Sequence, residues 1–91
     1  MYYVYVLISH SDSQFYVGFT NDLKMRLNSH AKGYVESTRN RRPLELVYYE
    51  ACLERNDALR REKYLKTTWG KRYLRNRIKS YVQTKMGHLT G

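Results

Sequence analysis

The sequence predicts an α+β fold in which helices pack against a three-stranded antiparallel sheet, in the order β-β-α-β-α-α. Two runs of β-branched and aromatic residues near the N-terminus flank a short polar segment, which is typical of a hairpin. A third such run lies between segments whose apolar residues recur at helical spacing. A chain of 91 residues has room for one domain. We assign that domain to residues 1–82 and expect a frayed tail over residues 83–91.

The pairing of the first two strands decides which side chains share a face. The strands are expected at residues 2–8 (YYVYVLI), 15–19 (FYVGF) and 44–50 (LELVYYE). If the hairpin is centred on its polar turn, Tyr5 faces Gly18 and Leu7 faces Tyr16, so both tyrosines lie on one face. A register slip of one residue would separate them. Gly18 has no side chain and leaves room for a close approach.

A first helix is expected between the second and third strands. Thr20 or Asn21 offers its N-cap and Asp22 lies in its first turn, where the helix dipole favours an anion. Its apolar stripe runs through Leu23, Leu27 and Ala31. Gly33 is placed to end the helix. Residues 34–42 then read as a polar loop with a basic end, closed by Pro43.

Two further helices are expected after the third strand. The first opens near residues 55–57 with Asn56 or Asp57 as its cap, and it runs to about Trp69. Gly70 interrupts the pattern. The last helix follows, with an apolar stripe that we interpret as core packing, through Leu74, Ile78, Tyr81 and Val82.

The charge is concentrated in the second half of the chain. Seventeen basic and eight acidic residues give +9, and the half before Arg55 is neutral. This asymmetry favours a polyanion partner, nucleic acid ahead of a merely solvated surface, although charge alone does not separate DNA from RNA or an acidic membrane. Nucleic-acid contacts are expected at Lys24, Arg39, Arg41, Arg42, Lys66, Lys71, Arg72 and Arg75.

Several classes of protein are excluded by composition. A single cysteine allows neither an internal disulfide nor a cysteine-based zinc site. Cys52 therefore fits a reducing compartment, and we expect a cytoplasmic protein. The sequence has no apolar stretch long enough to span a membrane, so a membrane partner is not expected.

Two polar positions stand out on the predicted helices. Glu62 falls inside the apolar stripe that contains Ala58 and Leu65, where a carboxylate must be paired, protonated or bound to a metal. The helical wheel alone favours an internal ion pair. Arg26 and His30 are four residues apart and share a face, which suits phosphate binding or proton transfer but is equally typical of a solvated helix surface.

Taken together, these residues resemble the GIY-YIG nuclease superfamily. Its two-part signature matches Tyr3-Val4-Tyr5 and Tyr16-Val17-Gly18, and its helical arginine, histidine and glutamate match Arg26, His30 and Glu62 in order. The resemblance covers residues 2–82. It is greatest to small stand-alone bacterial proteins related to the N-terminal nuclease domain of the bacterial excinuclease.

The resemblance implies an endonuclease that hydrolyses phosphodiester bonds in DNA with one divalent ion, Mg²⁺ or Mn²⁺. We expect it to select DNA structure, or weakly sequence, in repair or recombination. The resemblance further implies that Glu62 holds the metal and Arg26 contacts the scissile phosphate. One of Tyr5 and Tyr16 would be the general base and the other would orient it. His30 would bind phosphate or replace the base.

Two departures from the family pattern keep other functions open. Tyr3 replaces the first glycine of the signature, and Phe19 stands where the excinuclease domain carries a lysine. The task of that lysine would either pass to another residue, such as Lys24, or be lost. One alternative is a catalytically inactive nucleic-acid-binding module of the same fold. Another is an accessory protein with a larger protein partner. A homodimer is also compatible with so small a domain.

Overall fold

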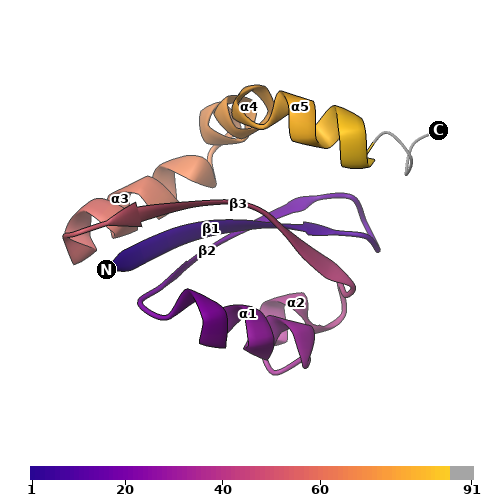
Figure 1. The fold of residues 1–91 in the computed structure, drawn as a ribbon, viewed down its shortest axis with the longest axis horizontal. Helices are drawn as coiled ribbons and strands as arrows, with labels where there is room; N and C mark the ends of the chain where they lie inside the picture. The colour runs from indigo at the N-terminus through magenta and orange to yellow at the C-terminus, as the bar shows by residue number, and fades with distance from the viewer. Residues whose placement is uncertain (87–91) are drawn as a thin grey trace.

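The computed structural model describes residues 1–86 and forms a three-layered α+β arrangement. Its elements are β1 (Tyr2–Ser9), β2 (Phe15–Thr20), α1 (Leu23–Ala31), α2 (Glu36–Arg39), β3 (Leu44–Cys52), α3 (Arg55–Leu65), α4 (Thr68–Arg77), α5 (Lys79–Tyr81) and the π-helix η1 (Val82–Met86). Helices α1 and α2 lie on one side of the sheet, and α3, α4 and α5 lie on the other (Figure 1). The predicted fold class is therefore confirmed.

The sheet has the strand order β2-β1-β3, with both pairings antiparallel. Strand β1 is central, which explains why its residues from Val4 to Ser9 are all buried. Tyr5 pairs with Gly18 and Leu7 pairs with Tyr16, so the predicted hairpin register is confirmed. Strand β2 is an edge of the sheet, so Tyr16 lies at an accessible border, while Tyr5 lies on the central strand and is fully buried.

Each face of the sheet has its own packing. On one face, valines of β1 and β2 form the main core with apolar residues of α3 and α4. The buried members are Val4, Val6, Val17, Ala58, Leu65 and Leu74. On the opposite face, Tyr5 meets His30 of α1, and both side chains are fully buried. A strand alternates its side chains between faces, so Val4 and Val6 serve the core while Tyr5 between them serves the α1 side.

The start of α1 corrects the predicted cap. Asp22 is the N-cap, and its carboxylate accepts a hydrogen bond from the Met25 amide at 3.1 Å. Thr20 is still part of β2 and Asn21 forms a bend, so neither occupies the capping position. The predicted end at Gly33 is confirmed, because Gly33 has φ +80° and its amide bonds to the His30 carbonyl.

The inner face of α1 also differs from the predicted stripe. His30 is 1% exposed, while Ala31 is exposed. Within the predicted polar loop, residues 36–39 form the short helix α2. Strand β3 continues to Cys52, two residues beyond the predicted end, and the thiol is half-buried.

The junction of α3 and α4 corrects the prediction of one helix to Trp69. Helix α3 ends at Leu65, and the Thr67 hydroxyl begins α4 by accepting a hydrogen bond from the Gly70 amide at 3.1 Å. Gly70 lies inside α4 and allows close packing, since a Cβ there would stand 2.1 Å from the Tyr64 carbonyl oxygen. Trp69 is 67% exposed.

The two ends of the helical region also differ from the sequence-based bounds. Glu54, rather than Asn56 or Asp57, is the N-cap of α3, and it makes no side-chain capping bond. Beyond α4, Ile78 is buried as predicted, and residues 82–86, which include the start of the expected tail, form η1. The remainder of the expected tail, residues 87–91, lies outside the described residues. No helix in the described part of the chain is long and apolar enough to cross a membrane.

Candidate functional site

Tyr5 is the centre of a buried polar cluster between β1 and α1. Its hydroxyl lies 2.7 Å from His30 Nε2 and accepts a hydrogen bond from Arg26 Nε at 3.2 Å. The ring crosses β2 at Gly18, where a Cβ would stand 2.3 Å from the Tyr5 Cζ atom. The glycine opposite Tyr5 therefore provides the space in which this hydroxyl reaches α1.

The hydrogen bonds of the cluster assign the protons. The Tyr5 oxygen accepts from Arg26, and because the buried hydroxyl also needs an acceptor, we assign its hydrogen to His30 Nε2 at 2.7 Å. His30 Nδ1 then carries the imidazole proton and donates it to the buried Thr38 hydroxyl at 2.7 Å. Burial, with the positive charge of Arg26, lowers the pKa of His30 to about 4. The imidazole is therefore neutral near pH 7, as this chain of hydrogen bonds requires.

The raised pKa and the burial of Tyr5 argue against its acting as the general base. Burial raises the pKa of Tyr5, and the opposing hydrogen bond and charge of Arg26 do not fully offset that effect. The residue has no exposed surface. Tyr5 therefore keeps its proton and holds Arg26 and His30 in place.

Tyr16 lies beside Tyr5 but is more accessible. Its ring centroid is 6.4 Å from that of Tyr5 and 5.3 Å from that of His30. The residue is half-buried, and its hydroxyl receives one long hydrogen bond, from Ser37 Oγ at 3.4 Å. Hydrogen bonding to Tyr5, together with a smaller effect of Tyr16, raises the pKa of Arg26. The guanidinium thus joins both tyrosines.

Glu62 lies on α3, the helix that packs on the opposite side of the sheet from α1 (Figure 1). Its side chain is 20% exposed and forms an ion pair with the exposed Lys66, one helical turn on, at 3.3 Å. Its charge adds to the raised pKa of Tyr5, although it is the smallest of the causes. No group of three or more His, Cys, Asp or Glu side chains in the described part of the chain could enclose a metal ion. A cation at Glu62 would need most of its oxygen ligands from water and substrate, as Mg²⁺ commonly does.

The more buried ion pair of α3 is formed not by Glu62 but by Arg61, the residue before it. Arg61 Nε and Nη2 each donate to the Glu50 carboxylate at 2.8 Å, and the Tyr48 hydroxyl donates to it at 2.8 Å. The Arg61 guanidinium also lies 4.6 Å from the centroid of the Tyr73 ring. Sequence reasoning missed this network because alternation on β3 alone does not show which helix residue meets Glu50.

The predicted nucleic-acid contacts divide into engaged and open cations. Arg41 donates twice to Asp12 and lowers the pKa of that carboxyl to about 2, so it holds the hairpin turn. Arg42 bonds to the carbonyls of Arg39 and Ala31. Lys66 lies in the turn between α3 and α4 and pairs with Glu62. The others lie at exposed or half-exposed positions on the helices, at Lys24, Arg39, Lys71, Arg72 and Arg75.

Comparison with known proteins gives one consistent result. The model of a family described as the GIY-YIG catalytic domain matches residues 1–77. A UPF0213 protein of Bacillus pumilus is 42% identical over 67 residues, covering 72% of this chain and 67% of the relative. A UPF0213 protein of Streptococcus agalactiae is 43% identical over 65 residues, covering 70% and 73%.

A solved structure agrees with these relatives. The solution NMR structure of the UPF0213 protein BH0048 from Bacillus halodurans is similar to this fold, with a TM-score of 0.51 and 35% identity. The similarity covers 81% of this chain and 82% of that one.

Proposed function

Because this chain belongs to the GIY-YIG catalytic-domain family, we propose that it is an endonuclease that hydrolyses phosphodiester bonds of DNA. The observation that carries this proposal is the convergence of Tyr5, Tyr16, Arg26 and His30 in one hydrogen-bonded cluster. A site for phosphoryl chemistry needs a fixed cation and a proton acceptor side by side, and this cluster places the Arg26 guanidinium beside two tyrosine hydroxyls.

The residues present suit a single hard divalent ion. Glu62 would hold Mg²⁺ or Mn²⁺, because its carboxylate is engaged among the described residues by one flexible surface lysine. Such an ion, when bound, neutralises charge on the phosphoryl oxygens and makes a bound water more acidic. This donor set fits a site that shares its ligands with solvent and substrate.

The two tyrosines receive different roles in this proposal. We assign the general base to Tyr16, because it is half-buried, whereas Tyr5 is fully buried, and because the Arg26 guanidinium also acts on its hydroxyl. Tyr5 is a positioning residue, since its buried hydroxyl is occupied by Arg26 and His30. Arg26 contributes a permanent positive charge to the phosphate, and its contact with Tyr5 fixes the guanidinium.

The basic half of the chain supports DNA as the partner. Phosphate contacts from lysine and arginine give affinity without reading bases. We therefore propose a structure-selective or weakly sequence-selective enzyme that acts in repair or recombination in the cytoplasm.

A second function, DNA binding without cleavage, is favoured by one observation. Phe19 stands where the excinuclease domain carries a lysine, so that cation is lost. The Arg55 guanidinium lies 5.7 Å from the centroid of the Phe19 ring and keeps a positive charge close to that strand. Because Arg55 supplies a positive charge near the lost lysine, we keep DNA cleavage as the first proposal. DNA binding without cleavage is the alternative that the missing lysine favours.

The test compares cleavage by matched tyrosine variants. Plain, flap and branched DNA are incubated at low salt with Mg²⁺, Mn²⁺ or EDTA. We expect cleavage by the wild type with a divalent ion and none in EDTA. Tyr16→Phe should lose at least about a hundredfold in rate, the lower end of what general-base removal costs. Tyr34→Phe is the control, because Tyr34 is 75% exposed and apart from the cluster.

Binding with no cleavage under any metal would favour the second function. Equal rates for Tyr16→Phe and the wild type would contradict the assignment of the base.

A further inference from the structure

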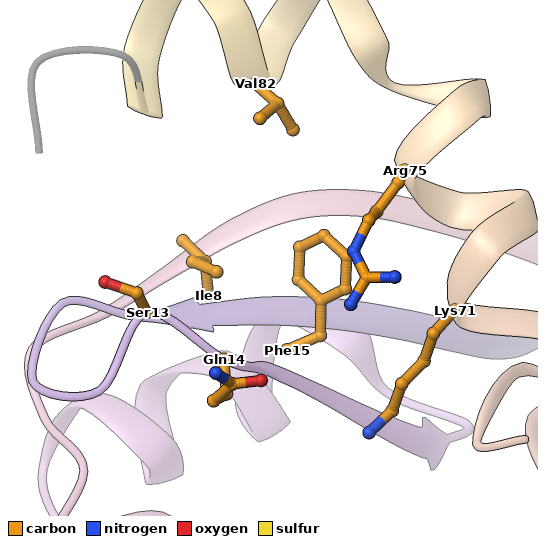
Figure 2. Close-up of a pocket in the computed structure, with 7 residues that line it drawn as sticks. All are labelled: Ile8, Ser13, Gln14, Phe15, Lys71, Arg75 and Val82. Atoms are coloured by element: carbon orange, nitrogen blue, oxygen red, sulfur yellow. The ribbon is translucent and has the colours of Figure 1, made fainter. Parts of the chain in front are cut away.

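A pocket lies on the far side of the sheet from Tyr5, between the β1–β2 hairpin and the C-terminal helices. It has a volume of about 180 Å³. Its lining consists of Ile8, Ser13, Gln14, Phe15, Lys71, Arg75 and Val82 (Figure 2). The pocket volume is well below the roughly 300 Å³ or more that is usual for a drug-sized ligand. The space suits a single planar ring.

The pocket combines an apolar interior with a basic side. The Phe15 ring lies next to Ile8 on the sheet, and Val82 faces them from η1 across the pocket (Figure 2). The Arg75 guanidinium lies beside the Phe15 ring, and the Lys71 side chain extends from α4 toward β2 (Figure 2). The two cations are four residues apart and share one face of the helix. Among the side chains that the structure describes, neither of them forms an ion pair.

The pocket is connected to the candidate active site through the edge strand. Phe15 and Tyr16 are neighbours on β2, and successive side chains of a strand point to opposite faces. Lys66, which pairs with Glu62, lies between α3 and α4 and precedes Lys71 by five residues. A strand of nucleic acid that passes the β2 edge can therefore contact both places.

We propose that this pocket binds one unpaired nucleotide of a DNA strand, with its base against Phe15 and its phosphate on Lys71 and Arg75. The proposal rests on the proposed function, since it supplies the substrate class for that site: DNA with a single-stranded segment. An aromatic ring beside unpaired cations is the arrangement by which proteins hold single strands without reading sequence. The charge of +9 also favours a polyanion over a neutral ring compound.

The test measures binding in EDTA, so that no cleavage is involved. Fluorescence anisotropy compares a short duplex with a three-nucleotide thymidine extension and the same duplex whose extension is abasic. The wild type should bind the base-bearing extension at least about fivefold more tightly, the lower end for one stacked base. Val82→Trp, which fills the pocket from its helical side, should abolish the difference and leave abasic binding unchanged.

Two charge-reversal variants with the same net charge distinguish binding in the pocket from non-specific electrostatic attraction of DNA. Arg75→Glu should weaken binding and reduce the difference, because Arg75 lines the pocket. Lys63→Glu is the control: Lys63 is an exposed cation of α3 that does not line the pocket, and its replacement should preserve the difference. Both residues are exposed, so neither change should unfold the protein.

Two results would overturn the proposal. They are equal binding of both extensions by the wild type, and a difference that survives Val82→Trp. If the protein binds the base-bearing extension more tightly but never cuts DNA, the proposed cleavage is contradicted and the pocket proposal stands. If it cuts DNA but binds both extensions equally, the pocket proposal alone is contradicted.

Discussion

Acidification should destabilise the protein through His30. In the fold, His30 Nε2 accepts the Tyr5 hydrogen and Nδ1 donates to Thr38, so a second imidazole proton breaks the chain of hydrogen bonds. Arg26 adds a repulsive charge. The pKa of His30 is lowered from 6.5 to about 4 in the fold. At about 1.4 kcal/mol per pKa unit, the neutral form contributes about 3 kcal/mol to the free energy of unfolding.

The direction of the pH dependence follows from the lowered pKa. Between pH 6.5 and about 4, unfolded chains carry a proton on this imidazole and folded chains do not. The contribution is therefore fully present above pH 6.5, falls as the pH decreases, and is lost below about pH 4.

Urea unfolding at half-unit steps from pH 8 to pH 4 measures this loss. His30→Gln is the matched variant, because glutamine can donate and accept hydrogen bonds but does not titrate. The wild type should lose about 3 kcal/mol more than His30→Gln across this range. Asp12, whose pKa is lowered to about 2, titrates alike in both proteins and cancels in the difference. Parallel curves, or an NMR titration of His30 near pH 6.5, would refute the reasoning.

Three substitutions test the packing around the site by urea unfolding. Gly18→Ala should lower the free energy of unfolding by about 1–3 kcal/mol and reduce any cleavage, because the new Cβ meets the Tyr5 ring. Unchanged stability would show that Tyr5 has room to move. Gly70→Ala should cost about 3 kcal/mol or more, since its neighbours are backbone atoms of α3; a smaller loss than for Gly18→Ala would contradict this. Arg61→Ala should cost about 2 kcal/mol, because Glu50 is left half-buried without its cation, and Arg60→Ala at a 74% exposed side chain should cost far less.

The sequence predicted the sheet because strand alternation and turn length together determine the register. Centring the hairpin on its polar turn pairs Tyr5 with Gly18, and a slip by one residue would turn the buried valines of β1 away from the main core. Arg26 and His30 were found by their spacing on one helix. Their burial was not predicted, because an arginine and a histidine four residues apart are equally typical of a solvated surface.

The features that were missed depend on tertiary contacts. Periodicity continued from α3 into α4, so the break at Thr67 was hidden; a threonine three residues before a glycine was the available capping signal. Thr38, whose hydroxyl is hydrogen-bonded to His30 Nδ1, lies on a helix of four residues that has no apolar stripe to indicate it in the sequence. The pocket beside Phe15 joins residues of the hairpin to residues of α4 and η1, and no local pattern connects them.

The central claim is that this cluster cleaves phosphodiester bonds with help from Glu62. Its most direct test is single-turnover cleavage of a flap DNA in Mg²⁺ by the wild type, Glu62→Gln and Glu54→Gln. Glu62→Gln keeps the shape of the side chain and removes one surface ion pair, so it should fold normally. Glu54 is an exposed glutamate at the start of the same helix and makes no side-chain capping bond. We predict cleavage by the wild type and Glu54→Gln and none by Glu62→Gln. Equal cleavage by all three proteins would contradict the account.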